Sequence, residues 1–566
     1  MAGLDKQFDY SVPDALVDRV QVGTIVRVEL HGRRVGGWVT AVFDAARSAV
    51  ASDSLKPVAK VTGHGPDALL IELAGWAAER WAAKGARPFL VAASPDRAIT
   101  ALPAPRRTAA DPQPASPATR DLLAGGGGVL RLPPMADVLP VLLAAAARGA
   151  LLVVVPTVHD ARRYAGRLRD VGATTAVMPD EWAHAAGGVD VVIGPRSAAW
   201  APCVDLASAI VVDEHDEALQ EEGSPTWHAR DVVVERCRRA GVPCVLVSPI
   251  PSLVAIETAA GDRGVVHPPR ERERAGWPRL TVVDRTDEDP WKRSLLTSPL
   301  IERIRNRDLT VVCISNITGR ARVLACRACR SLIRCERCDA AVGLSADNRL
   351  ACRRCGIDRP PVCQACGASR FANLRPGVTR LREELEAAAA RPVAEISTRD
   401  TGPPAAAGVY IGTEAALYRA PASDVIAFLE FDSEMLAPRF RAAEQALALI
   451  VRAGRRAPEV LIQTFSPDHD VVRAATSGDP DIVVTAERAR RRMLGLPPYG
   501  ALAAVSGAGA ADFVEQIDRG VVDVGGDEAT GYVVRAAEWF ALGRALRAVD
   551  RPKGSRLRVA VDPPRI

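Results

Sequence analysis

Residues 326–366 read CRACRSLIRCERCDAAVGLSADNRLACRRCGIDRPPVCQAC, a block that holds eight of the twelve cysteines of the chain in four CxxC pairs. A CxxC pair places two sulfurs on one side of a tight turn, so two pairs supply the four ligands of a tetrahedral metal site. Four thiolates leave no open position for water, which is typical of structural zinc rather than of a catalytic metal. The block therefore predicts a small module that binds two zinc ions.

The spacing of the pairs favours a nested arrangement. Thirteen residues separate Cys338 from Cys352, enough for a short hairpin, whereas five residues separate the first two pairs and seven the last two. Spacing alone also allows consecutive pairing. The arginines of the block either balance the negative charge of the metal centres or form a DNA-binding patch, and composition does not separate these two hypotheses.

The remaining cysteines occur singly in apolar, strand-like runs, where a buried and inert thiol is expected. They are Cys203, Cys237, Cys244 and Cys313.

On both sides of the block, apolar runs such as LLVVVP, AIVVDEH, VYIGTE and EVLIQTF alternate with helical stretches. This alternation is typical of βα units around a parallel sheet. The first hundred residues alternate like strands, as in GTIVRVEL and GGWVTAVF, and are followed by a linker dense in Pro and Ala.

The sequence thus predicts a multidomain α/β protein with five parts. These are a small β-rich domain (1–100), a linker (101–120), a first α/β lobe (121–308), a second α/β lobe (309–468) with the cysteine-rich insertion (326–370), and a small α+β C-terminal domain (469–566).

The formal charge of +5 and the pI of about 8.6 permit binding to nucleic acid without requiring it. No secretory signal is evident in MAGLDKQFDYSVPD, and the apolar run at 138–156 is broken by Arg148, Gly149 and prolines. We therefore expect a cytoplasmic protein without a membrane partner.

With these features in place, the chain resembles the PriA family of bacterial replication restart over nearly its whole length. LDKQFDYSVPD and VRVELHGRRVGGWV resemble the 3′-end DNA-binding domain of that family, and VVDEHDEALQEE, WHARD and VLVSPIPS resemble its first motor lobe. The segment from CRACR to CGASR resembles its two-zinc insertion, and FLEFDSEMLAPRFRAAEQ resembles part of the second lobe. The resemblance implies two RecA-like, helicase-type lobes.

The resemblance also implies site residues. One zinc would be held by Cys326, Cys329, Cys363 and Cys366, and the other by Cys335, Cys338, Cys352 and Cys355. A pocket for a DNA 3′ end would use Phe8 to stack on the terminal base, Asp9 to accept from the 3′ hydroxyl and Lys56 to pair with phosphate. Without the resemblance, Phe8 reads as a core residue and Asp9 as a turn residue.

The motor motifs depart from the family pattern. A phosphate loop reads GxxxxGK followed by Ser or Thr, because the lysine pairs the terminal phosphates and the hydroxyl binds magnesium. Residues 122–140 read LLAGGGGVLRLPPMADVLP; we interpret the glycines as the turn between a strand and a helix, with Pro134 and Met135 at the lysine and threonine positions. The remaining nucleotide-site candidates form a relic consisting of Gly128, Asp213, Glu214 and Arg455.

We predict a divergent PriA-like protein that has lost helicase activity and for which bound ATP is doubtful. It would bind forked and single-stranded DNA, including 3′ ends, and act with primosome, helicase-loading and single-strand-binding proteins to promote replisome reloading. One alternative is an active ATP-dependent 3′-to-5′ DNA helicase that holds ATP with the amides of Gly125–Gly128 and with Arg131. The other is a zinc-dependent DNA- or protein-interaction module of a different DNA transaction.

A smaller prediction concerns AERARRRML, residues 486–494. Arg488, Arg491 and Arg492 can share one face of a helix there and contact DNA phosphates, or they can form an ordinary solvated face.

Overall fold

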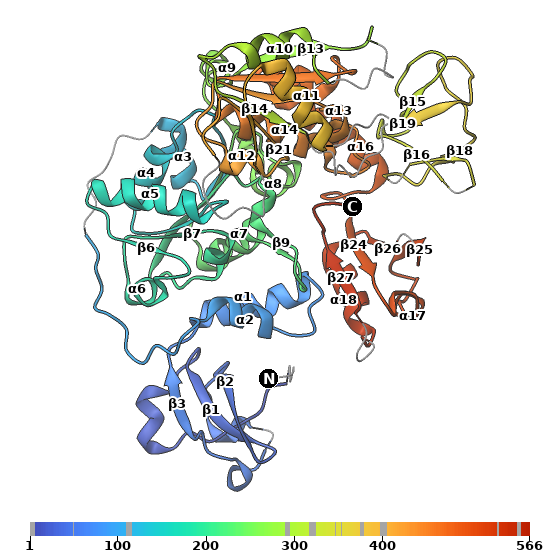
Figure 1. The fold of residues 1–566 in the computed structure, drawn as a ribbon. Helices are drawn as coiled ribbons and strands as arrows, with labels where there is room; N and C mark the ends of the chain where they lie inside the picture. The colour runs from blue at the N-terminus through green and yellow to red at the C-terminus, as the bar shows by residue number, and fades with distance from the viewer. Residues whose placement is uncertain are drawn as a thin grey trace. The chain divides into compact units, whose positions relative to one another are not determined.

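The computed structural model describes residues 6–48, 50–108, 116–288, 295–315, 324–345, 347–352, 354–373, 378–396, 405–528, 531–551 and 556–566. The middle of the predicted linker, residues 109–115, lies outside this set. The chain forms two compact units (Figure 1). The first contains residues 1–130, 137–266 and 497–563, and the second contains residues 131–136, 267–496 and 564–566.

The N-terminal part of the first unit is a three-stranded antiparallel sheet in the order β2-β1-β3. Its strands are β1 (Ile25–Leu30), β2 (Arg33–Trp38) and β3 (Lys60–Gly63). His31 and Gly32 both take positive φ, 49° and 73°, in the two-residue turn between β1 and β2, which suits the twist of a tight hairpin. Val26, Val28 and Val58 form its small core.

The predicted β-rich domain is confirmed, but its strands end at Gly63. Helices α1 (Ala68–Arg80) and α2 (Arg87–Ala93) follow, and their apolar faces join the core of the first α/β lobe. Trp182, for example, donates a hydrogen bond from Nε1 to the carbonyl of Ala93 at 3.0 Å.

The first lobe is a seven-stranded sheet in the order β12-β4-β11-β8-β5-β7-β6, with parallel pairing. Its strands are β4 (Gly127–Arg131), β5 (Ala150–Val154), β6 (Thr175–Val177), β7 (Val191–Gly194), β8 (Leu206–Val212), β11 (Cys244–Ser248) and β12 (Val265–Val266). Its helices are α3 (Pro117–Ala124), α4 (Leu139–Ala146), α5 (Val158–Asp170), α6 (Trp182–Gly187), α7 (Ala229–Ala240) and α8 (Leu253–Ala259). A short ribbon of β9 (Gln220–Glu221) and β10 (Trp227–His228) lies before α7.

The glycine run does not lie where the sequence placed it. It connects helix α3 to strand β4, so it precedes the strand instead of following it. Gly127 has φ of 103°, and a Cβ there would lie 2.0 Å from the carbonyl oxygen of Cys244 on β11. Close approach of two strands at the amino end of the sheet therefore explains the glycine requirement, because only glycine fits such a contact.

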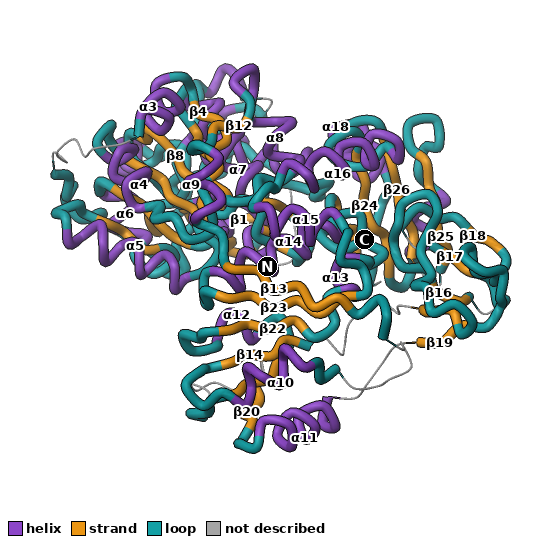
Figure 2. Tube along the Cα trace, turned by 90° about the horizontal axis from the view of Figure 1, so that it is seen from above, coloured by secondary structure: helices purple, strands orange, loops and turns teal. Residues whose placement is uncertain are grey.

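The second unit contains a six-stranded parallel sheet in the order β13-β23-β22-β14-β21-β20 (Figure 2). Its strands are β13 (Arg279–Asp284), β14 (Val311–Ile314), β20 (Val393–Ile396), β21 (Val409–Gly412), β22 (Val425–Phe428) and β23 (Glu459–Thr464). Its helices are α9 (Arg270–Ala275), α10 (Ser298–Arg305), α11 (Val378–Ala389), α12 (Ala416–Arg419), α13 (Asp432–Met435), α14 (Ala442–Gly454), α15 (Asp470–Ser477) and α16 (Asp481–Leu494). Two parallel sheets confirm the predicted pair of α/β lobes.

The cysteine-rich module is inserted between β14 and α11, as expected. Its short strands are β15 (Leu324–Cys326), β16 (Gly343–Leu344), β17 (Leu350–Ala351), β18 (Asp358–Arg359) and β19 (Phe371–Asn373), arranged as one pair and one three-stranded sheet.

The C-terminal α+β part belongs to the first unit and forms the antiparallel sheet β25-β26-β24-β27. Its elements are β24 (Ala501–Ser506), α17 (Ala510–Glu515), β25 (Asp523–Asp527), β26 (Gly531–Ala536), α18 (Trp539–Ala548) and β27 (Arg558–Val561). Helices α15 and α16, which we had assigned to this part, lie in the second unit. Among the described residues, no helix is long and apolar enough to cross a bilayer.

Candidate metal centres and nucleic-acid interface

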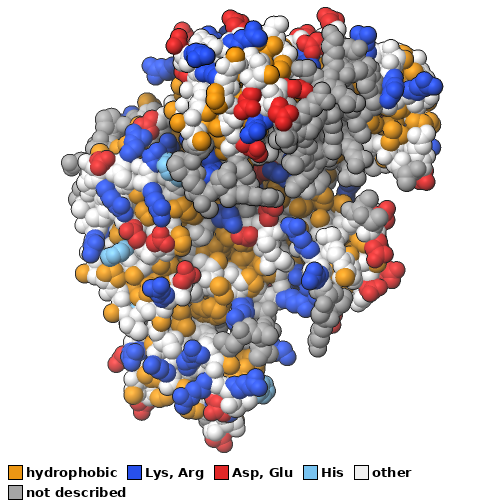
Figure 3. Space-filling view, viewed as in Figure 1, with side chains coloured by type: hydrophobic (Ala, Val, Ile, Leu, Met, Phe, Trp, Pro, Cys, Tyr) orange, Lys and Arg blue, Asp and Glu red, His pale blue; other side chains and the backbone are white. Residues whose placement is uncertain are grey.

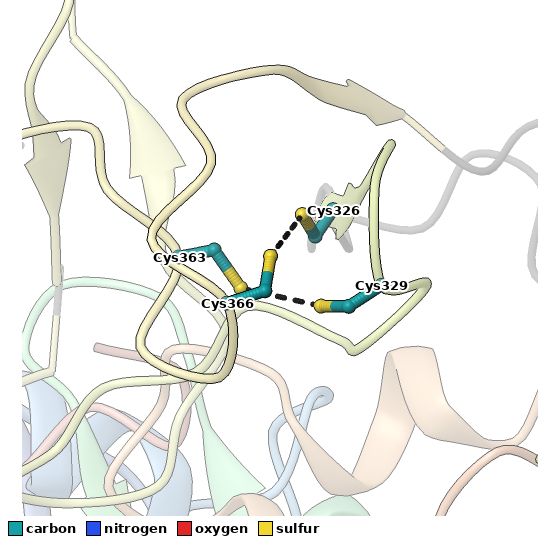
Figure 4. A group of neighbouring side chains, drawn as sticks. All are labelled: Cys326, Cys329, Cys363 and Cys366. Atoms are coloured by element: carbon teal, nitrogen blue, oxygen red, sulfur yellow. Dashed lines mark hydrogen bonds between the residues drawn. The ribbon is translucent and has the colours of Figure 1, made fainter.

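The eight clustered cysteines form two groups of four, and the grouping is the nested one. Within each group the sulfur atoms lie within 4.8 Å of one another. The outer cluster is defined by Cys326, Cys329, Cys363 and Cys366, whose thiols point toward one another in Figure 4. The inner cluster is defined by Cys335, Cys338, Cys352 and Cys355.

The sulfur–sulfur distances suit a shared metal ion. Sγ of Cys326 lies 3.6 Å from Sγ of Cys366, and Sγ of Cys338 lies 3.5 Å from Sγ of Cys352. A tetrahedral site with metal–sulfur bonds of about 2.3 Å separates its sulfurs by about 3.8 Å, whereas a disulfide needs about 2.05 Å. Each cluster can therefore hold one metal ion with four sulfurs.

All four CxxC turns have the same backbone geometry. In each, the residue directly after the second cysteine takes positive φ and donates its N–H to the carbonyl of the first cysteine, at 2.8 to 3.0 Å. These residues are Arg330, Asp339, Gly356 and Gly367. Two glycines and an aspartate tolerate this conformation well, and Arg330 adopts it because the surrounding turn fixes it. The turn holds both sulfurs on the same side of the chain.

The thiols differ in how readily they ionise. Burial raises the pKa of Cys335 to about 11. In the outer cluster, a hydrogen bond with the hydroxyl of Ser331 lowers the pKa of Cys329 to about 6. In the same outer cluster the pKa of Cys366 is raised to about 12, so a metal ion, which binds cysteine as the thiolate, has to displace protons in both clusters.

Two arginines of the module are structural. Arg354 is buried and donates to the carbonyl of Arg439 at 2.8 Å and to that of Cys338 at 3.0 Å. Arg334 donates to the hydroxyl of Ser466, which in turn donates to Asp432 at 2.8 Å. These bonds tie the module to the second lobe, so neither arginine belongs to a free DNA-binding patch.

In the N-terminal domain, the three predicted DNA-contact residues lie on neighbouring segments. The N–H of Ser11 donates to the carbonyl of Lys56 at 3.0 Å, which brings the Phe8–Asp9 segment beside Lys56. Phe8 is exposed, and Asp9 accepts a hydrogen bond from Ser48 at 2.6 Å. An exposed phenylalanine next to a carboxylate contradicts the reading of Phe8 as a core residue.

Lys56 is held by an ion pair that the sequence did not reveal. Its Nζ lies 2.8 Å from Oε1 of Glu29, and both side chains are about half exposed. The hydrogen bond from Lys56 lowers the pKa of Glu29, and the same contact raises the pKa of Lys56. Lys56 is therefore positioned over β1 and remains accessible to an anion.

Strand β4 ends in an arginine that is already paired. Arg131 is 2% exposed, and its guanidinium donates to Asp481 at 2.7 Å and to Glu273 at 3.2 Å. Glu273 is itself fully buried. An arginine committed to two carboxylates cannot replace a phosphate-binding lysine without leaving the buried Glu273 with only the weaker contacts of Arg270 and His267.

The loop after β4 uses its own polar groups internally. Pro133 and Pro134 lack an N–H, the N–H of Met135 donates to the carbonyl of Gly276 at 3.1 Å, and that of Ala136 donates to Pro133 at 2.9 Å. From Pro133 to Ala136, the loop therefore offers none of the free amides that cradle phosphate in a nucleotide loop.

In the first unit, the N-terminus of α4 carries a carboxylate. Asp137 accepts from the N–H of Leu139 at 3.1 Å and forms an ion pair with Arg167 at 2.6 Å. The hydrogen bonds from Arg167 hold the pKa of Asp137 below its ordinary value, so it is negatively charged at neutral pH. A negative side chain at the position where a helix would attract phosphate disfavours phosphate.

Comparisons with known proteins bear on the N-terminal domain and on the chain as a whole. Residues 1–90 match the family model described as the 3′ DNA-binding domain of PriA. The chain is similar to proteins called replication restart protein PriA, at 27% identity over 369 residues in Bacillus subtilis and 28% over 373 residues in Chlamydia pneumoniae. In Treponema pallidum the identity is 31% over 342 residues.

Residues 1–90 thus match the 3′ DNA-binding domain of PriA, and the chain is similar to PriA proteins over a little more than half of its length. These matches cover 55% to 59% of this chain and 45% to 50% of the relatives, so the chain spans about half the length of the PriA proteins it matches. Among solved structures, S. cerevisiae Dbp5 bound to RNA and ADP BeF3 covers 67% of this chain and 94% of its own, at 11% identity and a TM-score of 0.36.

The predicted acidic motif of this chain is part of a buried ion-pair network. Glu214 is fully buried, accepts from the N–H and hydroxyl of Ser252 at 2.6 and 2.8 Å, and pairs with Arg230 at 3.2 Å. Burial opposes ionisation of the neighbouring Asp231, but Arg230 and other cations lower its pKa to about 2. Asp213 precedes Glu214, is buried, and takes positive φ of 54°.

The two remaining candidates for a nucleotide site are Gly128 and Arg455, and the structure shows where each lies. Gly128 lies within β4, next to the helix-to-strand turn described above, and thus at the amino end of the strand. Ligands of parallel α/β sheets bind at the carboxyl ends, so this position does not suit a nucleotide. Arg455 follows α14 and donates from Nε to the carbonyl of Pro134 at 3.1 Å.

The predicted arginine face on α16 does not include Arg491. Arg491 has no exposed surface, and its guanidinium is paired with Glu487 at 2.9 Å and with Glu444. Arg488 is half-buried and Arg492 is exposed. The hypothesis that all three arginines contact DNA together therefore fails, because burying Arg491 requires its carboxylate partners.

Sequence reasoning missed Asp137, Glu273 and Arg230 as residues that decide what the motor region can do. Asp137 was detectable, because an acid directly before a helix is an ordinary start signal. The Glu273 and Arg230 pairings are set by residues distant in sequence, and composition gives no sign of them. Cys203 and Cys313 match the expectation of buried thiols, since burial raises their pKa values to about 11 and about 12.

Proposed function

We propose that this chain binds forked and single-stranded DNA, including its 3′ end, in replication restart, and that it does so without hydrolysing ATP. The match of residues 1–90 to the 3′ DNA-binding domain of PriA supports the DNA part. The names of the relatives support the process. Because the chain spans about half of those relatives, their other activities are not carried over.

The N-terminal pocket would act by stacking and charge. Exposed Phe8 is available to stack on the terminal base, and Asp9 can accept from the 3′ hydroxyl through an oxygen that Ser48 does not occupy. Lys56 would exchange its bond to Glu29 for a phosphate oxygen. A phosphate on the 3′ end would place a second anion next to Asp9 and weaken binding.

The absence of ATP hydrolysis rests on the loop between β4 and α4. Prolines replace the amide donors, Arg131 is committed to Glu273 and Asp481, and Asp137 adds negative charge at the start of α4. Each feature by itself disfavours the binding of a triphosphate, which needs a lysine and free amides to neutralise its charge. This loop is the observation that carries the proposed loss of motor activity.

The two cysteine clusters would each hold zinc as a structural ion. Four sulfurs close the coordination sphere, so the ion would supply folding free energy to the module rather than chemistry. We propose that the chain acts in the cytoplasm as a scaffold that joins fork DNA to primosome, helicase-loading and single-strand-binding proteins.

The test combines ATP turnover with DNA binding by the full chain. We expect no phosphate release from ATP in the presence of forked DNA, and tighter binding to a fork with a 3′ hydroxyl than to the same fork with a 3′ phosphate. Phe8→Ala should remove this preference, whereas Phe540→Ala should retain it, because Phe540 is equally exposed but lies on α18.

DNA-stimulated ATP hydrolysis would overturn the proposed loss of motor activity and support the helicase alternative. Equal affinity for the two forks would overturn the 3′-end pocket. Absence of any fork binding would overturn the proposed function as a whole.

A further inference from the structure

One face of the sheet β2-β1-β3 is covered by the small core, and the other face is open around Arg27 and Glu29, whereas Trp38 at its end packs on the first lobe and donates to Ser94 at 2.8 Å. In this antiparallel sheet, residues directly opposite each other point to the same side. Val26 is opposite Val61 and Val28 is opposite Val35, so these valines define the core face together with Val58. The residues between them on β1 therefore define the open face.

The open face is cationic. Arg27 on β1 is opposite Gly36 of β2 on one side and Lys60 of β3 on the other, and Arg34 is opposite Glu29. Arg27, Arg34 and Lys60 are all exposed. Figure 3 shows Lys and Arg side chains gathered over this domain, at the bottom of the view. We name Arg27, Arg34 and Lys60 the sheet-face cations.

This arrangement lowers the stability of the sheet. Arg27 and Lys60 are like charges directly opposite each other, a pairing that destabilises adjacent strands. Among the described residues, no carboxylate lies within ion-pair distance of either side chain. Gly36, the neighbour of Arg27 on β2, has no side chain, so the backbone is not covered at this point of the face. A bound anion would remove the repulsion and could approach the backbone closely.

The face also continues to the predicted 3′-end pocket. Glu29 lies on it, two residues from Arg27, and holds the ammonium of Lys56 at 2.8 Å. Because Lys56 and Glu29 neutralise each other, the face carries three net positive charges in a row that starts beside the pocket. Regularly repeated negative charge along a chain is the property of a nucleic-acid backbone.

We propose that the sheet-face cations bind successive phosphates of the DNA strand that ends in the Phe8–Asp9 pocket. The inference rests on the proposed function for the position of the 3′ end. It adds a second site that reads the strand backbone, independent of the terminal hydroxyl. Glu29 acts as an internal competitor, since it holds Lys56 until a phosphate replaces it.

The test uses the full chain and fluorescent single-stranded oligonucleotides ending in a 3′ hydroxyl or a 3′ phosphate. Affinity is measured between about 50 and 200 mM salt, where each phosphate contact to a single strand adds about 0.7 to the slope of log K against log salt. Arg27→Gln/Lys60→Gln should lower this slope by about 1.4 and weaken binding at least tenfold, equally for both oligonucleotides.

Arg19→Gln/Arg33→Gln is the matched control. It removes the same charge from exposed arginines of the same domain, and Arg33 is opposite Leu30, on the other side of the sheet from its neighbour Arg34. We expect less than a threefold change. Melting curves without DNA check folding, and Arg27→Gln/Lys60→Gln should melt no lower than the wild type, because it removes the like-charge contact.

Equal slopes for the two double variants would overturn the sheet-face site. The site would also be overturned if Arg27→Gln/Lys60→Gln lost binding to poly-glutamate but kept binding to DNA, because the face would then recognise an acidic peptide. If wild type binds both 3′ ends equally while the slope still falls in Arg27→Gln/Lys60→Gln, the sheet-face site stands and the 3′-end pocket fails.

Discussion

The cysteine module and the β4–α4 loop are two regions in which the sequence predicted ligand-binding residues, and their polar groups are arranged in opposite ways. In the module, all eight sulfurs are present, and four identical turns aim them at two points. In the loop, the side chains that would bind phosphate are absent, and the polar groups that remain bind to each other.

The difference shows how to distinguish a site that can still bind a ligand from a site whose polar groups now bind to each other within the protein. Both regions sit on well-formed scaffolds, with buried strands on either side. In the module, however, the eight thiols converge in two groups whose spacing suits a metal ion, and bonds such as that of Cys329 to Ser331 lie within the module. In the loop, Arg131 and Asp137 are satisfied by the protein itself, so a ligand would have to break existing ion pairs.

The largest expected effect is the loss of metal from the module. Removing zinc with a strong chelator should unfold residues of the insertion, because structural zinc contributes on the order of 10 kcal/mol in small cysteine sites. Cys338→Ser, in the buried inner cluster, should reduce the metal content measured by mass spectrometry from about two ions per chain to about one.

Cys203→Ser is the control for this measurement, since Cys203 is also buried but lies in the first lobe. It should retain both ions. A wild-type content well below two ions per chain would remove the distinction between the module and the loop.

The module was predictable from sequence, and the loop was predictable only in part. A CxxC pair encodes its own turn, and the spacing of the pairs favoured nested pairing although it also allowed consecutive pairing. The missing lysine was equally visible. The position of the glycine run was wrong, because a short apolar run beside glycines is compatible with either a strand or a helix. The close approach of Gly127, the first residue of β4, to the backbone of Cys244 shows that the glycine run lies at the start of that strand.

Buried charge was the other limit. Arg491 was predicted to lie on an exposed helix face, and Arg131 was a candidate ATP ligand in the helicase alternative, because arginine is rarely buried without a partner. Their partners come from distant parts of the chain: Glu444 is 47 positions from Arg491, and Asp481 is 350 positions from Arg131. Helical spacing gives one hint, since Glu487 lies four residues before Arg491. The remaining contacts depend on the tertiary fold.

A smaller effect, confined to stability, is expected from the converted loop. Arg131→Met would leave Glu273 buried and without its main cation, which costs about 3 to 5 kcal/mol. Urea denaturation of the full chain should show this in the transition of the second unit. Arg131→Met/Glu273→Leu should recover part of the loss, because neither charge then remains buried.

Arg162→Met is the surface control. Arg162 is 67% exposed and lies 3.5 Å from Asp180, so its loss should change the free energy of unfolding by less than about 1 kcal/mol. If Arg131→Met behaved like this control, Arg131 would be free to act as a ligand, and the loop would no longer contrast with the module.

The smallest expected effect concerns Asp137. Asp137→Ser keeps a side chain that can accept from the N–H of Leu139 but removes the half-exposed ion pair with Arg167, so the free energy of unfolding should fall by about 0.5 kcal/mol. ATP should still not bind in calorimetric titration, because the prolines and the paired Arg131 remain. Measurable ATP binding by this variant would mean that a single carboxylate blocks an otherwise competent site. The loop would then still be a phosphate-binding site, blocked by Asp137 alone, and phosphate would have to displace the other hydrogen bonds and ion pairs within the loop.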